Sequence, residues 1–475
     1  MNARKKILIV SMSALLVAGC LPEKRIVWSP DGSRAAVLGD DGLRIATPDG
    51  KLSDLLIPDA RRAAWFADGR RMLVILSNKR AKWAEVEPEL STEDRTRITE
   101  LAQVLRTQVL AHTGSPDTFE PKFSMPTTPG QVVASAMYVR DKMPEGMAEK
   151  LGDHWKDVEK FEMDLRRAVV FTIDGDRAIE GAKLVTSVDD LQEPSVSPSG
   201  RHAAFIRRTP KMESGDSLDP NDLVVIPADG TPSKPLIVEH VAFGYGWSFD
   251  GRSVAVIHTP TPSSKSVTVG AVATVEVVTS DGAQVDASDM KVEDRVGVFF
   301  NQFGCVKYLE DGRLIFSAHA ATLPATDQEM PRTWSLYAWS PSMRAGSTRL
   351  LGRGADAYLT DEQSTFEISP DGKRAVMYGG KGDTVVADLT TGETSVWFDT
   401  KEAAGTQSRP TWRNNEEVCA VTPNDVTKAK PEAWSVVLLK AEGASQTLST
   451  NWPETARSWL VTKPETAALQ ASEKQ

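Results

Sequence analysis

A short motif recurs along most of this 475-residue chain and constrains its fold more strongly than any other feature. In its most regular form, the motif is an aromatic residue followed by Ser-Pro-Asp-Gly, a basic residue and a short apolar run. Seven copies, the last the least regular, lie at residues 28–32, 65–69, 196–200, 247–251, 308–312, 368–372 and 412–416. Internal repeats of this kind predict a fold in which similar small units stack on one another.

Each copy predicts two β-hairpins. Apolar runs such as residues 34–38, 71–76 and 418–421 follow the motif with the patterning of strands. A second turn follows in every copy, at Asp49-Gly50, Asp174-Gly175, Asp229-Gly230, Asp281-Gly282, Ala345-Gly346, Thr391-Gly392 and Glu442-Gly443. Asp-Gly favours a hairpin because tight hairpin turns need positive φ. Each repeat is therefore predicted to form four strands, a to d.

A four-stranded sheet cannot bury both faces alone, so the repeats must pack against one another. We predict an all-β protein over residues 26–450, a seven-bladed β-propeller of four-stranded antiparallel blades. Six or eight blades remain possible because the last copy is weak. Residues 451–475 form a C-terminal tail that adds a strand or covers an edge. The Asp residues of the turns are predicted to cap them, and Trp28, Trp65, Trp247 and Trp412 to pack between blades.

The Ser-Pro-Asp-Gly repeats resemble the propeller family that includes TolB of the Tol–Pal system and the propeller domains of prolyl oligopeptidase-type enzymes. This resemblance implies a scaffold and no particular function. It is incomplete, because TolB has six blades and a separate N-terminal α/β domain. Here the first repeat starts six residues after Cys20, which leaves no room for such a domain.

The N-terminus has the organisation of an export signal. A basic stretch, Arg4-Lys5-Lys6, precedes an apolar run that is short for a bilayer-spanning helix. The ending Leu16-Val17-Ala18-Gly19-Cys20 resembles the lipobox of bacterial lipoproteins. It implies that residues 1–19 are a signal peptide, that Cys20 is lipidated and that residues 20–25 are a tether; an ordinary secretory signal is the alternative. Leu21 after the cysteine resembles the outer-membrane sorting class, on the periplasmic side.

The net charge and the cysteine content exclude two features: binding of nucleic acid and a disulfide framework. The net charge of −10 argues against nucleic acid, which requires a basic surface. Besides Cys20 there are only Cys305 and Cys419, in different repeats, and we expect each to be a small buried residue rather than half of a disulfide.

The repeats differ mainly between strands b and c. We predict that the a–b and c–d turns stay tight, so that all insertions leave from one face, which is the functional candidate. The largest insertion, residues 78–166 in blade 2, is predicted to be helical. A capping box at Ser91-Thr-Glu-Asp94 begins the first expected helix. Two further helices are expected at Gln131–Arg140 and Pro144–Arg166. We expect them to cap the channel; a membrane-binding helix is the alternative.

Because the strands alternate in direction, the first strand of repeat 1 begins on the face that carries the insertions, and the tether therefore lies on that face. Only residues 21–25 separate Cys20 from the first strand, and five extended residues reach at most about 18 Å. The insertion-bearing face beside repeat 1 should therefore lie close to the membrane.

Signals of catalysis are weak. His258 and His319 occupy equivalent positions, seven residues after their turn glycines, and some propeller lyases of acidic sugars hold a divalent metal with His on this face. A metal needs three or four converging ligands, and the equivalent positions in the other repeats supply none, so the two histidines are weak metal candidates. Gly215-Asp-Ser-Leu218 matches an esterase signature outside its usual structural context. We predict no catalytic residue and no cofactor.

These observations favour a membrane-anchored cell-envelope lipoprotein. Its propeller would act as a binding or scaffold module for a protein or glycan through the b–c loop face, with unknown binding residues. One alternative is a metal-assisted envelope enzyme, similar to a polysaccharide lyase, with its site at the channel mouth. The other is an assembly component without a ligand of its own.

Overall fold

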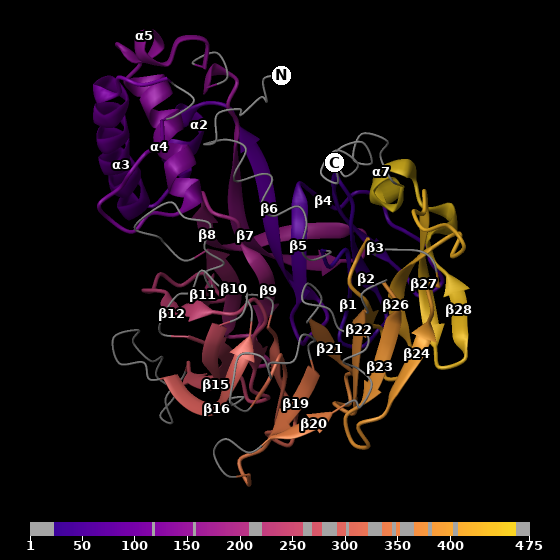
Figure 1. Ribbon diagram of the computed structural model, residues 1–475. Coiled ribbons are helices and arrows are strands. Elements are labelled where there is room, and N and C mark those ends of the chain that lie inside the picture. Colours follow the sequence, from indigo (N-terminus) through magenta and orange to yellow (C-terminus); the bar gives the residue numbers. More distant parts are fainter. Residues whose placement is uncertain are drawn as a thin grey trace.

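The protein is described from a computed structural model. The residues whose structure is described are 23–115, 119–154, 158–208, 221–259, 268–277, 292–300, 304–321, 335–343, 348–351, 365–378, 382–401 and 407–461. They are mostly β-strand with few helices, which confirms the predicted predominance of β-structure. Figure 1 shows the sheets following one another around the molecule in the order of the sequence.

The strands form consecutive antiparallel runs of four, which we call units 1 to 7. Unit 1 contains β1 (Ile26–Trp28), β2 (Ala35–Leu38), β3 (Gly42–Ala46) and β4 (Ile57–Pro58). Unit 2 contains β5 (Ala60–Trp65), β6 (Arg71–Arg80), β7 (Met163–Asp174) and β8 (Arg177–Ser187). Unit 3 contains β9 (Gln192–Val196), β10 (His202–Arg208), β11 (Asn221–Pro227) and β12 (Leu236–Val241).

The remaining four units repeat this arrangement. Unit 4 contains β13 (Gly246–Trp247), β14 (Ser253–His258), β15 (Thr268–Glu276) and β16 (Val292–Phe300). Unit 5 contains β17 (Val306–Tyr308), β18 (Leu314–Ala318), β19 (Ser335–Trp339) and β20 (Arg349–Leu351). Unit 6 contains β21 (Phe366–Ile368), β22 (Arg374–Tyr378), β23 (Thr384–Asp388) and β24 (Thr394–Phe398). Unit 7 contains β25 (Thr411–Trp412), β26 (Val418–Pro423), β27 (Trp434–Lys440) and β28 (Gly443–Thr447).

Five units are separate four-stranded sheets, whereas units 3 and 4 form one eight-stranded sheet. They are joined where Val241, at the end of β12, pairs with His258 at the end of β14. The neighbouring Ala242 continues this pairing by donating its backbone N–H to Ile257 O at 2.8 Å. The connection from unit 3 into unit 4 is therefore itself hydrogen-bonded to the sheet.

The repeated motif forms the turn between the first two strands of a unit. In unit 1, the Gly32 N–H donates to Ser29 O at 2.8 Å, and Gly32 has a φ of 66°, which favours glycine. The Asp31 carboxylate accepts from Ser29 Oγ at 2.6 Å and from Ser33 N at 3.1 Å. These bonds lower the pKa of Asp31, because they favour its charged form. Asp31 thus caps the turn, as predicted.

In units 2, 4 and 7, the tryptophan of the motif links the unit to the one before it. The Trp65 indole donates to Val27 O in β1 at 2.9 Å, and the Trp412 indole donates to Glu367 O in β21 at 3.0 Å. The motif's basic residue completes the contact, because the Arg34 guanidinium of unit 1 lies 5.0 Å from the centre of the Trp65 ring. The motif is therefore both a turn and an interface between units.

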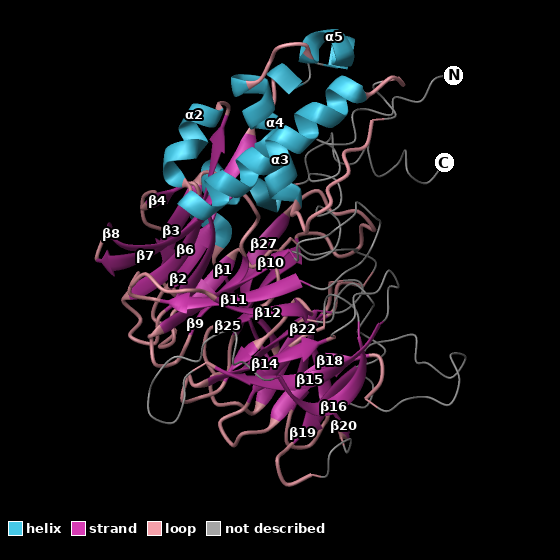
Figure 2. Ribbon diagram, turned by 90° about the vertical axis from the view of Figure 1, so that its left-hand side faces the viewer, coloured by secondary structure: helices cyan, strands magenta, loops and turns pink. Residues whose placement is uncertain are grey.

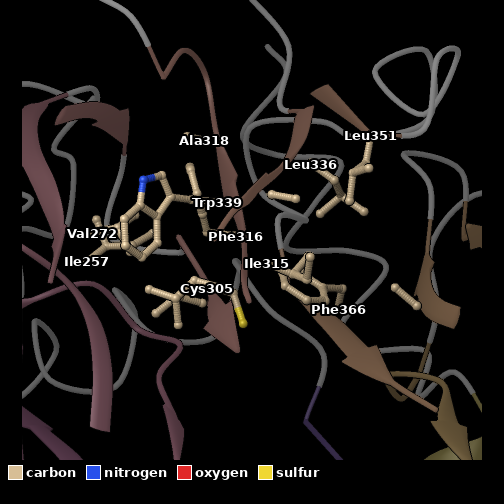
Figure 3. Packing of buried hydrophobic residues seen from close by; sticks show 14 of the residues in the cluster. Ile257, Val272, Cys305, Ile315, Phe316, Ala318, Leu336, Trp339, Leu351 and Phe366 are labelled. Carbon is tan, nitrogen blue, oxygen red and sulfur yellow. The ribbon is translucent and has the colours of Figure 1, made fainter. Parts of the chain in front are cut away.

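The cores lie between neighbouring units. The largest apolar cluster spans units 4, 5 and 6, and Figure 3 shows Trp339 beside Ile257 and Val272, with Phe366 from unit 6 nearby. Phe316 is fully buried in this cluster. Burial of such side chains supplies most of the favourable free energy of packing.

The segment between β6 and β7 carries most of the described helices. They are α2 (Trp83–Val86), η1 (Glu87–Glu89), α3 (Thr92–Ala111), α4 (Pro129–Lys142), α5 (Met147–Leu151) and η3 (Gly152–His154). Figures 1 and 2 show them at one end of the molecule, beyond the ends of β6 and β7. Ser91 caps α3 by accepting from Asp94 N at 3.0 Å. The helices pack on one another and on the extended part of β7 through residues such as Trp83 and Leu165.

Two predictions about this segment were wrong. Among its described residues, the third expected helix, Pro144–Arg166, contains α5, η3 and a helical turn at residues 158–159, and its last residues belong to β7. The inserted segment is also shorter than residues 78–166, since β6 and β7 remain paired as far as Arg80 and Met163. The alternating apolar residues Met163 and Leu165 are buried, as a strand pattern requires.

The prediction that the c–d turns all stay tight was also wrong. The connection between β3 and β4 covers residues 47–56, and that between β15 and β16 covers residues 277–291. In unit 1, the expected turn at Asp49-Gly50 does form, but it closes only an isolated bridge between Ala46 and Leu52 before β4 begins. Long connections therefore leave from both ends of the units. The expected turns Asp281-Gly282 and Ala345-Gly346 lie outside the described residues.

The described part of the C-terminal tail packs onto unit 1. It contains η6 (Ser449–Asn451), α7 (Glu454–Arg457) and η7 (Ser458–Leu460), and only Val461 bridges to a strand neighbour, Ala433. The Trp452 indole donates to Gly50 O at 2.9 Å. Of the two roles predicted for the tail, its described part thus covers an edge rather than adding a full strand.

Candidate functional site

The two ends of the units differ in what they carry. The first strand of each unit begins where the second strand ends, as in the pairing of Ile26 with Val37. The segments that enter the first strands, the helical segment and the other b–c connections therefore share one end, which we call the entry end. The motif turns lie at the opposite, turn end.

Charged side chains from the first strands and their entry segments gather in one place, which we call the central charge cluster. Its members are Glu23, Lys24, Arg62, Asp190, Glu193, Lys307, Glu367 and Arg409. Figure 1 shows the first strands β1, β5, β9 and β21 toward the middle of the molecule. The cluster thus joins residues that are far apart in the sequence and come from six of the units or their entry segments.

Arg62 and Asp190 form the first pair of the cluster. Arg62 Nη1 and Nη2 donate to the two Asp190 oxygens at 3.0 and 3.2 Å, and Arg166 Nε donates to the same carboxylate at 3.2 Å. Burial alone would raise the pKa of Asp190, but the two guanidinium groups outweigh it and lower the pKa to about 2. Glu23 Oε1 lies 3.5 Å from Arg62 Nη2 and brings the N-terminal segment into the same group.

Arg409 and Glu193 form the second pair, between the entry segments of units 7 and 3. Arg409 donates through both Nη atoms to the two Glu193 oxygens, with Nη1 to Oε2 at 3.1 Å. Such bidentate pairing fixes the relative orientation of the two side chains and also stabilises their opposite charges. Burial would raise the pKa of Glu193, but Arg409, with Lys24 and Lys307, lowers it to about 2.

Glu193 is held in an unusual backbone conformation. Its φ of 47° is in the left-handed region, which a residue with a Cβ rarely adopts. The Tyr245 hydroxyl donates to Glu193 O at 2.7 Å and lies 2.7 Å from Ser195 Oγ. Strained residues persist where surrounding contacts fix them, and they concentrate at functional sites.

The third part of the cluster contains more positive than negative groups. Lys24 Nζ pairs with Glu367, and Lys307 Nζ donates to Tyr245 O at 2.8 Å. No described carboxylate lies within 4.0 Å of Lys307 Nζ, yet its charge helps to lower the pKa of both Glu193 and Glu367. Burial opposes the lowering at Glu367, and Lys24 is the main positive charge that causes it.

Solvent reaches the cluster. The side chains of Lys24 and Glu367 are 26% and 31% exposed, whereas that of Arg409 is 10% exposed. Partly exposed, mutually paired charges of this kind remain ionised and accessible to a polar ligand.

The cluster is connected to the helical segment through the residues that precede β9. Asp189 is buried and accepts from Thr128 Oγ1 at 2.8 Å and from Gly130 N at 3.0 Å, at the N-terminus of α4. Burial raises the pKa of Asp189, although these bonds oppose the rise. Because Asp190 follows directly, one short segment fixes both α4 and the cluster.

Sequence reasoning missed this cluster, although a signal exists. We call the last residue of each motif copy, a glycine in all copies but the seventh, the turn position. The residues seven places before it are Arg25, Arg62, Glu193, Gly244, Cys305, Thr365 and Arg409. The fifth residues before it are Val27, Ala64, Ser195, Gly246, Lys307, Glu367 and Thr411. Alternate positions of a strand share a face, so charges at these two positions indicate a charged inner face.

The residues singled out from the sequence lie elsewhere. His258 is half-buried at the end of β14, where its backbone pairs with Val241 and Ala271. His319 is buried, and its N–H donates to Phe299 O at 2.9 Å. Within the described ranges, no group of three or more His, Cys, Asp or Glu residues is placed to hold a metal ion.

The cysteines and the esterase-like motif are placed as follows. Cys305 and Cys419 are buried free thiols, as predicted, and burial raises the pKa of each, that of Cys419 to about 12. Cys20 and Gly215-Asp-Ser-Leu218 lie outside the described residues. Among the helices that the structure describes, none is long and apolar enough to cross a bilayer.

Comparison with known proteins gives no family. No protein-family model matches the chain, and no curated protein matches it in sequence. Among solved structures, the chain is similar to one described as oligogalacturonate lyase in complex with manganese. The TM-score is 0.35 at 10% identity, over 88% of this chain and 76% of that chain. Neither the activity nor the metal of that enzyme is transferred to this chain.

Proposed function

We propose that this protein is a lipid-anchored binding protein of the bacterial cell envelope, on the periplasmic side of the outer membrane. Its seven units close into a seven-bladed β-propeller that binds an envelope protein or glycan at the entry end. The observation that carries the proposal is the central charge cluster, because it joins entry segments of several units into one partly exposed polar surface. Binding residues commonly lie on loops that a rigid scaffold holds in place.

Contacts between the last and first units support a closed ring. Thr411 Oγ1 donates to Ile26 O at 3.2 Å, and Arg409 N donates to Glu23 O at 3.3 Å. The Arg413 guanidinium lies 5.5 Å from the centre of the Trp28 ring. The same kinds of contact join successive units elsewhere, as between Trp65 and Val27.

The short tether supports the orientation. Glu23 and Lys24 are bound within the cluster, and only residues 21–22 separate them from Cys20. Three residue steps span at most about 11 Å, so a lipid on Cys20 would hold the entry end next to the membrane. A ligand would then reach the cluster from the side or along the ring.

Site-specific photo-cross-linking in cells tests the binding face. A photoreactive residue in place of Lys428, exposed in the b–c connection of unit 7, is expected to give a discrete adduct with an envelope component. The same residue in place of Asp229, exposed at the turn end, is the matched control and should give none. Adducts only from position 229 would contradict the proposal.

Replacement of the lipobox cysteine tests the anchor separately. Cys20→Ser should abolish labelling by a palmitate analogue and weaken the attachment of the chain to the membrane fraction, because the acyl chains that anchor it can no longer be added. Unchanged labelling of the variant would refute lipidation at Cys20 and leave the fold untouched.

A further inference from the structure

One part of the central charge cluster contains one more basic than acidic side chain. This part is the site formed by Lys24, Glu193, Lys307, Glu367 and Arg409. Two acids face three bases there, although the chain as a whole is acidic, with a net charge of −10. Lys24 and Arg409 each have their own carboxylate, so the excess charge resides on Lys307. The only hydrogen bond of Lys307 Nζ among the described residues goes to a backbone carbonyl, Tyr245 O.

Two hydrogen-bond donors, both on residues seven places before the turn position, also lack partners among the described residues. Arg409 Nε is buried and donates to no described acceptor, while both of its Nη atoms bind Glu193. Thr365 Oγ1, seven residues before its turn glycine like Arg409 before its own turn position, is likewise buried without a described partner. A buried donor without an acceptor is unfavourable, because it has lost its hydrogen bonds to water without replacing them. A ligand that supplies an acceptor would remove this penalty.

We propose that this site binds an anionic group, a carboxylate or phosphate of the ligand, with Lys307 as its main charge partner and Arg409 Nε as a further donor. This inference rests on the proposed function and deepens it by naming the chemistry of the ligand. Glu193 and Glu367 do not repel the anion strongly, because each is already neutralised by its own base. They instead hold Arg409 and Lys24 in place around the site.

The geometry also assigns the order of importance within the site. Lys307 lies on β17 between the buried Val306 and the half-buried Tyr308, and the pairing of β17 with β18 fixes its backbone in position. Lys24 belongs to the tether segment and is already paired with Glu367. Replacement of Lys307 should therefore reduce anion binding more than replacement of Lys24.

Calorimetric titration of the full chain in detergent tests the proposal with three probes: D-glucuronate, inorganic phosphate and neutral D-glucose. At least one of the two anions should bind, glucose should not, and binding should weaken as salt is added. The stronger anion identifies the ligand group as carboxylate or phosphate. Binding of glucose as strong as that of glucuronate, or binding of neither anion, would overturn the proposal.

Variants assign the effect to Lys307. Lys307→Gln should weaken anion binding about tenfold or more, because a charge-assisted hydrogen bond is lost. Lys307→Arg should retain affinity within about threefold, since the charge remains. Lys183→Gln, at an exposed lysine of β8, is the control and should leave binding unchanged. If Lys307→Gln does not fold, the Lys307→Arg variant and the salt dependence still decide.

The outcome is separable from that of the proposed function. Anion binding that depends on Lys307, in a chain that forms no adduct from position 428, would support the site and contradict the proposed binding face. Adducts from position 428 without anion binding would support the face and contradict the site.

Discussion

Two junctions between units are held together in different ways. Units 4, 5 and 6 share one apolar cluster, in which Phe316 and Ile315 are fully buried and the chain runs continuously from unit to unit. The junction between units 7 and 1 joins strands from opposite ends of the chain. It adds to its apolar cluster a set of directional polar contacts that include Thr411 to Ile26 and Trp452 to Gly50.

The difference has a physical reason. Where the chain is continuous, the connection itself limits how two units can shift, so units 4, 5 and 6 rely mainly on burial, with a few polar contacts such as that of Lys307 with Tyr245 O. Where no peptide connects the units, closure costs more chain entropy and the register must be fixed by bonds with defined geometry. The tail and the tether supply these bonds at the junction of units 7 and 1.

Truncation of Phe316 should have the largest effect. Phe316→Ala removes a fully buried ring from the cluster of units 4 to 6 and is expected to lower the free energy of unfolding by about 4 kcal/mol. Urea denaturation measures the change, which should not depend on salt. Phe249→Ala, at a ring that is 55% exposed, is the control and should change little. A cost below 1 kcal/mol for Phe316 would show that this junction is not held by burial.

Truncation of Trp452 should have the next largest effect. Trp452→Ala removes a buried side chain and its bond to Gly50 O, and is expected to cost about 3 kcal/mol. Trp452→Phe should recover most of the packing but not the bond, and so cost about 1 kcal/mol. The same unfolding measurement checks both. Equal costs for the two variants would mean that the bond, and not the packing, fixes the tail.

These two junctions also show which features the sequence can reveal. The hairpins of the motif follow from local rules, since Asp31 and Gly32 make the turn within a few residues. The third helix was mispredicted at its end because the alternation of Met163 and Leu165, which is the spacing of a strand face, was overlooked. The long c–d connections were missed because the turn at Asp49-Gly50 closes before strand d begins.

The candidate site was harder to predict, because its residues are far apart in the sequence. Glu193 and Arg409 are 216 residues apart, and only the arrangement of the units brings them together. Each charge alone is typical of a solvated strand end. Only alignment of the seven first strands on their turn positions shows that Arg62, Glu193 and Arg409 share one place. Around the metal candidates His258 and His319, the described residues form no group of three or more His, Cys, Asp or Glu side chains placed to hold a metal ion.

Neutralisation of Glu193 should have a moderate effect that depends on pH. Glu193→Gln leaves Arg409 without its carboxylate and is expected to cost about 2 kcal/mol at pH 7. The pKa of Glu193 is lowered to about 2 from its ordinary 4.5, so its contribution is fully present above pH 4.5 and is lost as the pH falls toward 2. Arg409 stays charged throughout this range, because its pKa is raised by Glu193.

The measurement is unfolding by urea at a series of pH values. The wild-type chain should lose about 2 kcal/mol more than Glu193→Gln between pH 4.5 and 2, so the two chains converge at the acid end. Glu416→Gln, at an exposed glutamate, is the control for a general loss of negative charge. A constant difference between wild type and Glu193→Gln across this range would contradict the ion-pair assignment.

The smallest effects concern the same contact at two junctions. Arg34 lies over Trp65 at a junction with a continuous chain, and Arg413 lies over Trp28 at the junction of units 7 and 1. Arg34→Gln is expected to cost about 0.5–1 kcal/mol, the value of a partly exposed cation–π contact. Both arginines donate to the carbonyl of a turn glycine in the neighbouring unit, Arg34 to Gly69 O and Arg413 to Gly32 O. Arg413→Gln should cost about 0.5 kcal/mol more, because Arg413 also pairs with Glu417. Thermal unfolding of both variants in parallel would test the comparison directly. The excess cost of Arg413→Gln should diminish at high salt, whereas equal costs at every salt concentration would mean that the two junctions are held alike.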